Sequence, residues 1–518
     1  MNILRAAFAA LFALSLAQSV FAQDITLTSH DGKVEVVGTL LGYDGEFYRV
    51  DTQFGELTVD GSGVTCDGPA CPNLTDFVAE VRFSGSSVIA ETLLPALAQG
   101  FAIEEGLTLS QPEGTGDLRV YALHHPDRQA PLARFIFRAT DTADGFIDLV
   151  ENTADVVLAQ REIRSDELEL TKAAGLGDLT QTRRSRVLAL DAIVPLVSAD
   201  NPVRQISLAD LVKVFTAEVA NWGDLGGPDA PISLHLPQVG SGLDQAVEDL
   251  LLAPANAHMT AQITRHDRNS DLVRTVSNDP FALGVASLAE AGTVRALPLT
   301  GGCGHALSAT RQSVKTEDYP LTSPMFFYLP QRRLPKVARQ FLAYTQSSAA
   351  QMVIRQAGFV DQSLETIQVG LQGDRLANAI STGGAEVGLE ELQRMIETLR
   401  PLSRLSLSFR FEPGSSRPDA QSRSNILNLA QALESGTLEA RQLIFVGFSD
   451  GEGAAVANSR IALQRAKTVR NAVLASVETS LPDSIEISVE GFGEAMPMAC
   501  DDTEWGRKVN RRVEVWIR

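Results

Sequence analysis

The stretch LIFVGFSDG, at residues 443–451, decides which fold the C-terminal part of the chain can adopt. Its apolar part, Leu443 to Phe448, predicts a buried strand, and Ser449-Asp450-Gly451 ends that strand with turn-forming residues. The helix predicted after this turn carries apolar residues on one face: Ala462, Ala466, Val469 and Val473. A strand that leads through a tight turn into such a helix indicates an α/β unit.

The same alternation of strands and helices continues on both sides of this stretch. The predicted strands are Leu405 to Phe411, Leu443 to Phe448, Ile485 to Val489 and Val513 to Ile517. Asn458 and Arg465 lie seven positions apart on the helix after the second strand. Gly491-Phe492-Gly493-Glu494 follows a later strand, and Gly506-Arg507 and Asn510 to Val515 close the chain.

With these motifs in this order, residues 405–518 resemble the OmpA-like peptidoglycan-binding domain. In that family an Asp after the second strand and an Arg on the next helix hold the diaminopimelate group of the peptidoglycan peptide. The resemblance implies these roles for Asp450 and Arg465, and Ser449 keeps the hydroxyl of the family's Thr. We also assign Asn458 to the site. Of the neighbours Arg511 and Arg512, one is expected to line the site and the other to be solvated, and we assign Arg512.

The chemistry of diaminopimelate fits these residue types. The ligand carries an ammonium and a carboxylate on one carbon, so a carboxylate such as Asp450 can accept from the first. A planar guanidinium such as that of Arg465 can pair bidentately with the second. The alternative is a surface salt bridge between Asp450 and Arg465, which the surrounding motifs disfavour.

Residues from about 75 to 360 alternate between short β runs and helical patterns, which favours an α/β architecture. Glu80-Val81-Arg82-Phe83 predicts a strand that runs into Ser84-Gly85-Ser86-Ser87 and then a helix. Further motifs are the apolar run Asp191 to Val197 and the segment Asn221-Trp222-Gly223-Asp224-Leu225. With these motifs the segment resembles the phosphate-binding proteins of phosphate ABC transporters, which implies two α/β lobes around a ligand cleft.

The resemblance and the physics of anion binding together assign five residues to this cleft: Ser86, Ser87, Thr142, Arg161 and Ser241. Hydroxyl groups and backbone N–H groups at helix starts can donate to an anion, and Arg161 supplies a cation. The sequence departs from the family at Ala159-Gln160-Arg161, where Ser-Ser-Arg is common, and at Pro237 and Leu243. These departures leave three alternatives open: phosphate, another oxyanion or small acid, or a cleft that no longer binds.

The N-terminal part is expected to be an export signal followed by a small β module. Residues 1–22 combine Arg5, an apolar stretch and a small residue, Ala22, where signal peptidase would cleave. A membrane anchor is the weaker alternative, because the apolar stretch is short for a bilayer. In the module, residues 23–73, Cys66 and Cys71 flank a turn and are expected to form a disulfide rather than ligate a metal. Spacing does not assign a pairing to Cys303 and Cys500.

Length and composition set the outer limits of these predictions. The chain has 518 residues, so three or four domains are expected. We predict a multidomain α/β and α+β protein, divided as follows: signal peptide 1–22, β module 23–73, two-lobed periplasmic binding protein-like domain 74–362, helical connector 363–404 and OmpA-like βαβαβ domain 405–518. The net charge of −20 opposes binding to nucleic acid or anionic lipid.

The function expected from the sequence is non-enzymatic. Nucleophile-elbow, HExxH and paired catalytic carboxylate motifs are absent from the sequence, and no cofactor or metal is expected. We predict a periplasmic protein that binds a small oxyanion such as phosphate and is tethered non-covalently to peptidoglycan, in association with the outer membrane. An envelope or outer-membrane protein is a further expected partner. The alternative function is structural, with a vestigial cleft.

Overall fold

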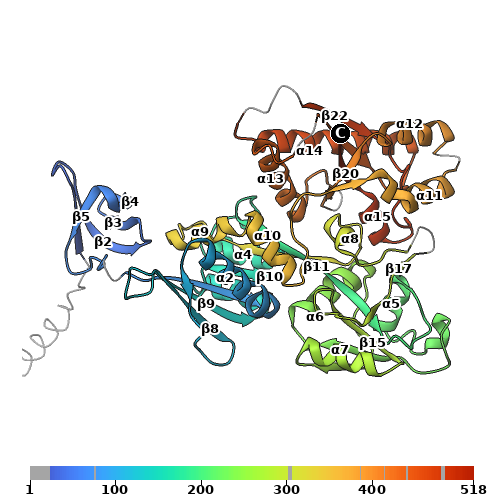
Figure 1. The fold of residues 1–518 in the computed structure, drawn as a ribbon, viewed down its shortest axis with the longest axis horizontal. Coiled ribbons are helices and arrows are strands. Elements are labelled where there is room, and N and C mark those ends of the chain that lie inside the picture. The colour runs from blue at the N-terminus through green and yellow to red at the C-terminus, as the bar shows by residue number, and fades with distance from the viewer. Residues whose placement is uncertain are drawn as a thin grey trace, which may run out of the picture.

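The computed structural model describes residues 24–74, 77–301, 306–384, 387–412, 415–438, 441–479 and 485–518. A small β module lies at one end of the elongated molecule, and a two-lobed domain and a C-terminal domain follow (Figure 1). The predicted signal peptide and Cys303 lie outside the described residues. Among the described helices, none combines the length and the apolar character that a bilayer span requires.

The β module is a five-stranded antiparallel sheet in the order β4-β3-β2-β1-β5. Its strands are β1 (Asp24–Ser29), β2 (Glu35–Tyr43), β3 (Phe47–Thr52), β4 (Gly55–Asp60) and β5 (Val64–Asp67), with the 3-10 turn η1 (Gly61–Gly63) before β5. The predicted disulfide between Cys66 and Cys71 is confirmed, with 5.9 Å between their Cα atoms. Glu46 anchors the module to the next domain through ion pairs to Lys336 and Arg339.

One continuous sheet runs through both lobes of the middle domain, in the order β14-β13-β15-β11-β18-β10-β6-β9-β8-β7. The long strand β11 (Ser185–Val197) joins the lobes, because its first part pairs with β18 (Thr322–Tyr328) and its last part pairs with β15 (Ala282–Ser287). The other strands of lobe 1 are β6 (Ala79–Ser86), β7 (Thr108–Leu109), β8 (Leu118–His124), β9 (Ala133–Thr140) and β10 (Val156–Ala159). Those of lobe 2 are β12 (Ile206–Ser207), β13 (Ser233–Pro237), β14 (Ile263–His266), β16 (Arg295–Ala296) and β17 (Leu299–Thr300).

Helices pack against both lobes and bury separate apolar clusters. Lobe 1 has the π-helical turn η2 (Ile89–Leu93), α2 (Leu94–Glu104), α3 (Thr142–Val150), α4 (Ser165–Ala173), α9 (Lys336–Tyr344) and α10 (Ser348–Gln356). Lobe 2 has α5 (Leu208–Phe215), η3 (Trp222–Leu225), α6 (Gly242–Val247), η4 (Glu248–Leu252), η5 (Ala253–Ala255), α7 (Asn269–Asn278) and α8 (Arg311–Lys315). The predicted two-lobed α/β architecture is therefore present.

The C-terminal domain is a five-stranded sheet in the order β19-β20-β23-β21-β22. Its strands are β19 (Thr366–Gln368), β20 (Ser403–Phe409), β21 (Gln442–Phe448), β22 (Glu486–Gly491) and β23 (Arg512–Ile517). Its helices are η6 (Val369–Gln372), α11 (Gly373–Thr382), α12 (Leu389–Leu399), α13 (Ala420–Glu434), α14 (Ala455–Ser476) and α15 (Glu504–Asn510). The α11 and α12 pair, part of the predicted connector, packs on one face of this sheet.

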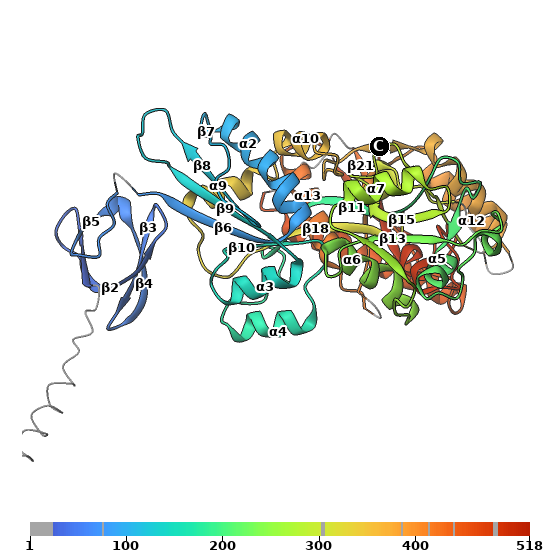
Figure 2. The ribbon, with the colours of Figure 1, turned by 90° about the horizontal axis from the view of Figure 1, so that it is seen from below.

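The C-terminal domain shares apolar core with lobe 2. Met498, Trp505 and Val509 belong to the apolar cluster of that lobe, and the Trp505 indole donates to the carbonyl of Leu250 over 2.8 Å. Figure 1 shows the C-terminal domain beside lobe 2, and in Figure 2 the two overlap at the end of the molecule away from the β module. Ala420, at the start of α13, packs into a cluster of lobe 1. The C-terminal domain therefore contacts both lobes.

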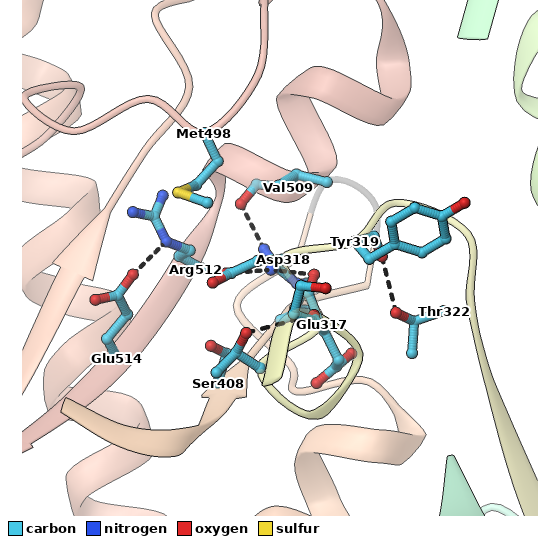
Figure 3. A network of polar contacts seen from close by, with 12 residues as sticks. Glu317, Asp318, Tyr319, Thr322, Ser408, Met498, Val509, Arg512 and Glu514 are labelled. Carbon is cyan, nitrogen blue, oxygen red and sulfur yellow. Dashed lines mark hydrogen bonds and ion pairs between the residues drawn. The ribbon is translucent and has the colours of Figure 1, made fainter. Parts of the chain in front are cut away.

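Buried charges reinforce this junction (Figure 3). Arg404 of β20 makes two hydrogen bonds, of 2.6 and 3.1 Å, to Asp318, which precedes β18 in the middle domain. Glu514 of β23 accepts from Arg375 and Arg512. Burial alone would raise the pKa of Glu514, but the charge of Arg375 and the other guanidinium groups lowers it to about 2. Asp318 and Glu514 therefore each have a guanidinium partner, as a buried charge requires.

Candidate functional site

The first candidate site lies where β21 ends and α14 begins, at the residues singled out by their motifs. Asp450 lies two residues beyond the end of β21, and its Oδ2 atom accepts a hydrogen bond of 2.7 Å from Arg511. Arg511 also donates to Glu504 over 2.6 Å. The carboxylate of Asp450 therefore faces a cation that comes from the segment just before β23.

Arg465 of α14 has no partner of opposite charge within hydrogen-bond or ion-pair distance in the described part of the chain. Its guanidinium carbon lies 5.2 Å from the centre of the Phe411 ring, and it makes no hydrogen bond or ion pair with any described residue. Burial and the neighbouring charge of Arg511 lower the pKa of Arg465. A half-buried guanidinium without a counter-ion is suited to bind an anion.

Two further polar groups of the site are buried and unsatisfied. The Ser449 hydroxyl and the Asn458 side-chain nitrogen have no hydrogen-bond partner among the described residues. Both side chains are only 3% exposed. Leaving a buried polar group unpaired costs about 1–3 kcal/mol, so such a group in a folded protein calls for an explanation, and a ligand provides one.

The position of Arg512 differs from the prediction. Its side chain is fully buried and donates to Glu514 over 2.7 Å and to the carbonyl of Met496 over 3.0 Å. Its guanidinium carbon also lies 4.3 Å from the centre of the Phe448 ring. Arg512 therefore belongs to the buried network, and the structure places Arg511 beside Asp450 in its stead. Arg511 directly precedes β23, and Arg512 is the first residue of that strand. Successive side chains of an extended segment point to opposite faces, so the two arginines point in different directions.

The second candidate site is the cleft between the two lobes. A cavity of about 280 Å³ lies there, and both Ser87 and Ser241 line it. Three carboxylates, those of Glu91, Asp267 and Glu290, line it as well. Burial raises the pKa of Glu290, whose carboxylate also accepts from Asn269. Arg268 is the cation in this lining, and its side chain is 81% exposed. The cavity is thus predominantly acidic.

The other three predicted anion ligands are occupied by contacts within the protein. Arg161 forms a two-pronged ion pair with Glu167, at 2.7 and 2.8 Å. The Ser86 hydroxyl donates to Oε1 of Gln160 over 2.8 Å, and the Thr142 hydroxyl accepts from the backbone N–H of Gln160 over 3.2 Å. The five predicted residues therefore surround the cleft but do not converge on one empty position.

Comparison with known proteins identifies both parts. A family model described as the PBP superfamily domain matches residues 75–349, more than half of the chain. The chain belongs to the PBP superfamily. This PBP-superfamily chain also matches a model of the OmpA family over residues 410–511. The expected presence of a PBP-like domain and an OmpA domain is confirmed.

Individual relatives cover separate parts of this PBP-superfamily chain. Protein SphX of Synechococcus elongatus is 25% identical over 231 residues, which are 42% of this chain and 66% of SphX. The phosphate-binding protein PstS of Borreliella burgdorferi is 22% identical over 43% of this chain and 78% of its own length. The probable lipoprotein YiaD of Escherichia coli is 36% identical over 72 residues, which are 14% of this chain and 31% of YiaD.

A solved structure, an ABC-type phosphate transport receptor from Vibrio cholerae, aligns over 54% of this chain and 99% of its own with 17% identity and a TM-score of 0.41.

Within the described part of the chain, no group of three or more His, Cys, Asp or Glu residues is arranged to hold a metal ion.

Two residues of these sites were missed by sequence reasoning. Arg511 was left as one of two alternatives, because adjacent arginines cannot be told apart by spacing. Gln160 was noted only as a departure from the family pattern, since its contacts to Ser86 and Gly242 join segments more than 70 positions apart. The signal in the sequence that could have identified Gln160 is the glutamine at a position where the resembled family commonly has a serine.

Proposed function

We propose that this protein is a non-enzymatic component of the cell envelope that binds the diaminopimelate peptide of peptidoglycan through its OmpA domain and so holds its PBP-superfamily domain at the wall. The observation that carries the proposal is the unpaired, half-buried guanidinium of Arg465 beside the ion-paired Asp450. Membership of the OmpA family supports it.

The proposed ligand would provide a partner for each unpaired polar group of the site named above. The carboxylate of diaminopimelate would accept from Arg465, and its ammonium would donate to Asp450, which still has acceptor capacity beside Arg511. The Ser449 hydroxyl and the Asn458 side-chain amide would supply further hydrogen bonds. A zwitterion would leave the net charge of the site unchanged, because its own ammonium and carboxylate charges cancel.

The proposal is tested by sedimentation of the mature protein with isolated diaminopimelate-type peptidoglycan. Arg465→Ala and Asp450→Ala should each reduce the bound fraction sharply, because each leaves one charge of the ligand unpaired. Arg470→Ala is the matched control, because Arg470 lies on the same helix and bonds only to its neighbour Asn471 among the described residues. Equal sedimentation of all four proteins would refute the assignment.

A second candidate function is oxyanion binding in the cleft, favoured by membership of the PBP superfamily and by relatives named as phosphate-binding proteins. Ser86, Ser87, Thr142, Arg161 and Ser241 remain the candidate contacts. The acidic cavity and the commitment of Arg161 to Glu167 argue for weak affinity. Calorimetry of the full chain with phosphate and with sulfate tests this candidate. If neither anion gives a heat of binding up to millimolar concentration, oxyanion binding by the wild-type protein is refuted.

A further inference from the structure

The side chain of Gln160 bridges the two lobes at the base of the cleft. Its Oε1 atom accepts from the Ser86 hydroxyl of lobe 1 over 2.8 Å. On the opposite side the same oxygen faces Gly242 of lobe 2 so closely that a Cβ atom on that glycine would lie 2.1 Å from it. Gln160 itself is 3% exposed. A carbonyl oxygen of the protein is thus enclosed between the lobes.

Neighbouring side chains hold the lobes together around this glutamine. Arg161 donates from Nε to the side chain of Gln245 in α6 over 3.0 Å. Arg164 makes two hydrogen bonds, of 2.8 and 2.9 Å, to Asp249 of lobe 2. Both arginines follow β10 in lobe 1. The lobes therefore contact each other through the protein's own side chains.

The charges around Gln160 suit a neutral group better than an anion. The Ser86 hydroxyl has one proton to donate, and Gln160 already accepts it. Arg161 is neutralised by Glu167 at 2.7 Å. The adjoining cavity is lined by Glu91, Asp267 and Glu290. An entering oxyanion would have to displace the glutamine and would then lie near carboxylates, with its nearest guanidinium already paired.

We propose that Gln160 determines whether the cleft admits an oxyanion, because its carboxamide oxygen occupies the position between Ser86 and Gly242 that an oxygen of the ligand would take. This inference rests on the second candidate function, the oxyanion site. The uncharged carboxamide of Gln160 takes the place of the ligand in the cleft. Arg161 then pairs with Glu167 instead of with a ligand.

The test uses the full chain and inorganic phosphate. Gln160→Ser frees the Ser86 hydroxyl and the space beside Gly242, so it should tighten phosphate binding at least tenfold over wild type. Adding Glu167→Gln should tighten it further, since Arg161 loses its closer charged partner and keeps only Asp249 at 3.8 Å. Gln160→Met keeps the bulk but removes the acceptor oxygen, so it should stay as weak as wild type. Gln312→Ser, at an exposed position of α8, is the matched control.

Hydrogen exchange and thermal unfolding keep the outcomes distinct. Cooperative thermal unfolding of each variant, followed by circular dichroism, shows that the chain is folded whether or not it binds peptidoglycan. Exchange at Ser86 and at the start of α6 should be faster in Gln160→Ser than in wild type. Wild-type binding as tight as that of Gln160→Ser would overturn the role of Gln160 while leaving the oxyanion site standing. Absence of binding in every variant, with faster exchange in Gln160→Ser, would instead show that the opened cleft is not an oxyanion site, and this too overturns the proposal.

Discussion

Asp450 and Arg511 form an ion pair of 2.7 Å, whereas Arg465, on the helix that follows Asp450, has no ion pair with any residue that the structure describes. We therefore expect the two arginines of the site to have different tasks. Arg511 is proposed to position the carboxylate that meets the ligand ammonium, and Arg465 is proposed to meet the ligand carboxylate itself.

This difference predicts unequal effects of substitution on the affinity for a soluble muropeptide that carries diaminopimelate. Arg465→Ala should weaken binding by about 10- to 150-fold, the value of a charged hydrogen bond of roughly 1.5–3 kcal/mol. Arg465→Lys should recover only part of this loss, because an ammonium lacks the bidentate geometry. Arg511→Ala should cost less than Arg465→Ala. Calorimetry measures all three, and a larger loss in Arg511→Ala would reverse the assigned roles.

The buried pair of Arg404 and Asp318 predicts a large effect on stability. Arg404→Ala leaves the Asp318 carboxylate buried without its two hydrogen bonds, and removing one partner of such a pair costs about 3–5 kcal/mol. The double variant Arg404→Met with Asp318→Leu should recover most of this loss, because it removes both charges. Urea unfolding measures the free energies, and a double variant no more stable than Arg404→Ala would contradict the argument.

Glu317, beside the same junction, predicts a stability that falls with rising pH. Burial and the charge of Asp419 raise its pKa from 4.5 to about 8, and its Oε1 atom has no hydrogen-bond partner among the described residues. Between these values the folded chain holds a proton that the unfolded chain has lost, so this group's contribution declines as pH rises from 4.5 to about 8.

The pH prediction is tested with Glu317→Gln, which cannot ionise. The variant should be more stable than wild type at pH 8.5 and should match it near pH 4, as measured by thermal unfolding. Glu452→Gln, at an exposed position after β21, is the control and should follow wild type throughout. Parallel pH profiles of Glu317→Gln and wild type would show that Glu317 does not cause the slope.

The cysteines predict a chain without free thiols. Cys66 pairs with Cys71, and Cys500 is disulfide-bonded. Since the sequence holds four cysteines, we expect peptide mapping of non-reduced, alkylated protein to recover a cross-linked peptide that contains Cys303 and Cys500. Alkylated Cys303 in protein from the periplasm would rule this pairing out.

The sequence predicted the elements well where one residue pattern decided them. The strand expected at Leu443 to Phe448 is β21 (Gln442–Phe448), and the strand expected at Val513 to Ile517 is β23 (Arg512–Ile517). The three-residue strand β19 was missed, because it lies at the edge of the sheet within a segment predicted as a helical connector.

The candidate sites were predicted less completely, since they depend on which partner a side chain selects. Asp450 and Arg465 follow from local motifs. Arg161 was expected to meet an anion, but Glu167, six positions later, pairs with it instead. Sequence alone names both residues and cannot decide whether they face each other or a ligand.

The shared core of lobe 2 and the C-terminal domain has a mechanical consequence. If the OmpA domain binds the wall as proposed, tension from a stretching wall would enter the protein through that domain. Because Met498, Trp505 and Val509 lie in the same core as lobe 2, the load passes directly into that lobe rather than being absorbed by an extensible linker. In optical-tweezer pulling from the OmpA domain, lobe 2 should therefore yield together with it, in a single rupture event.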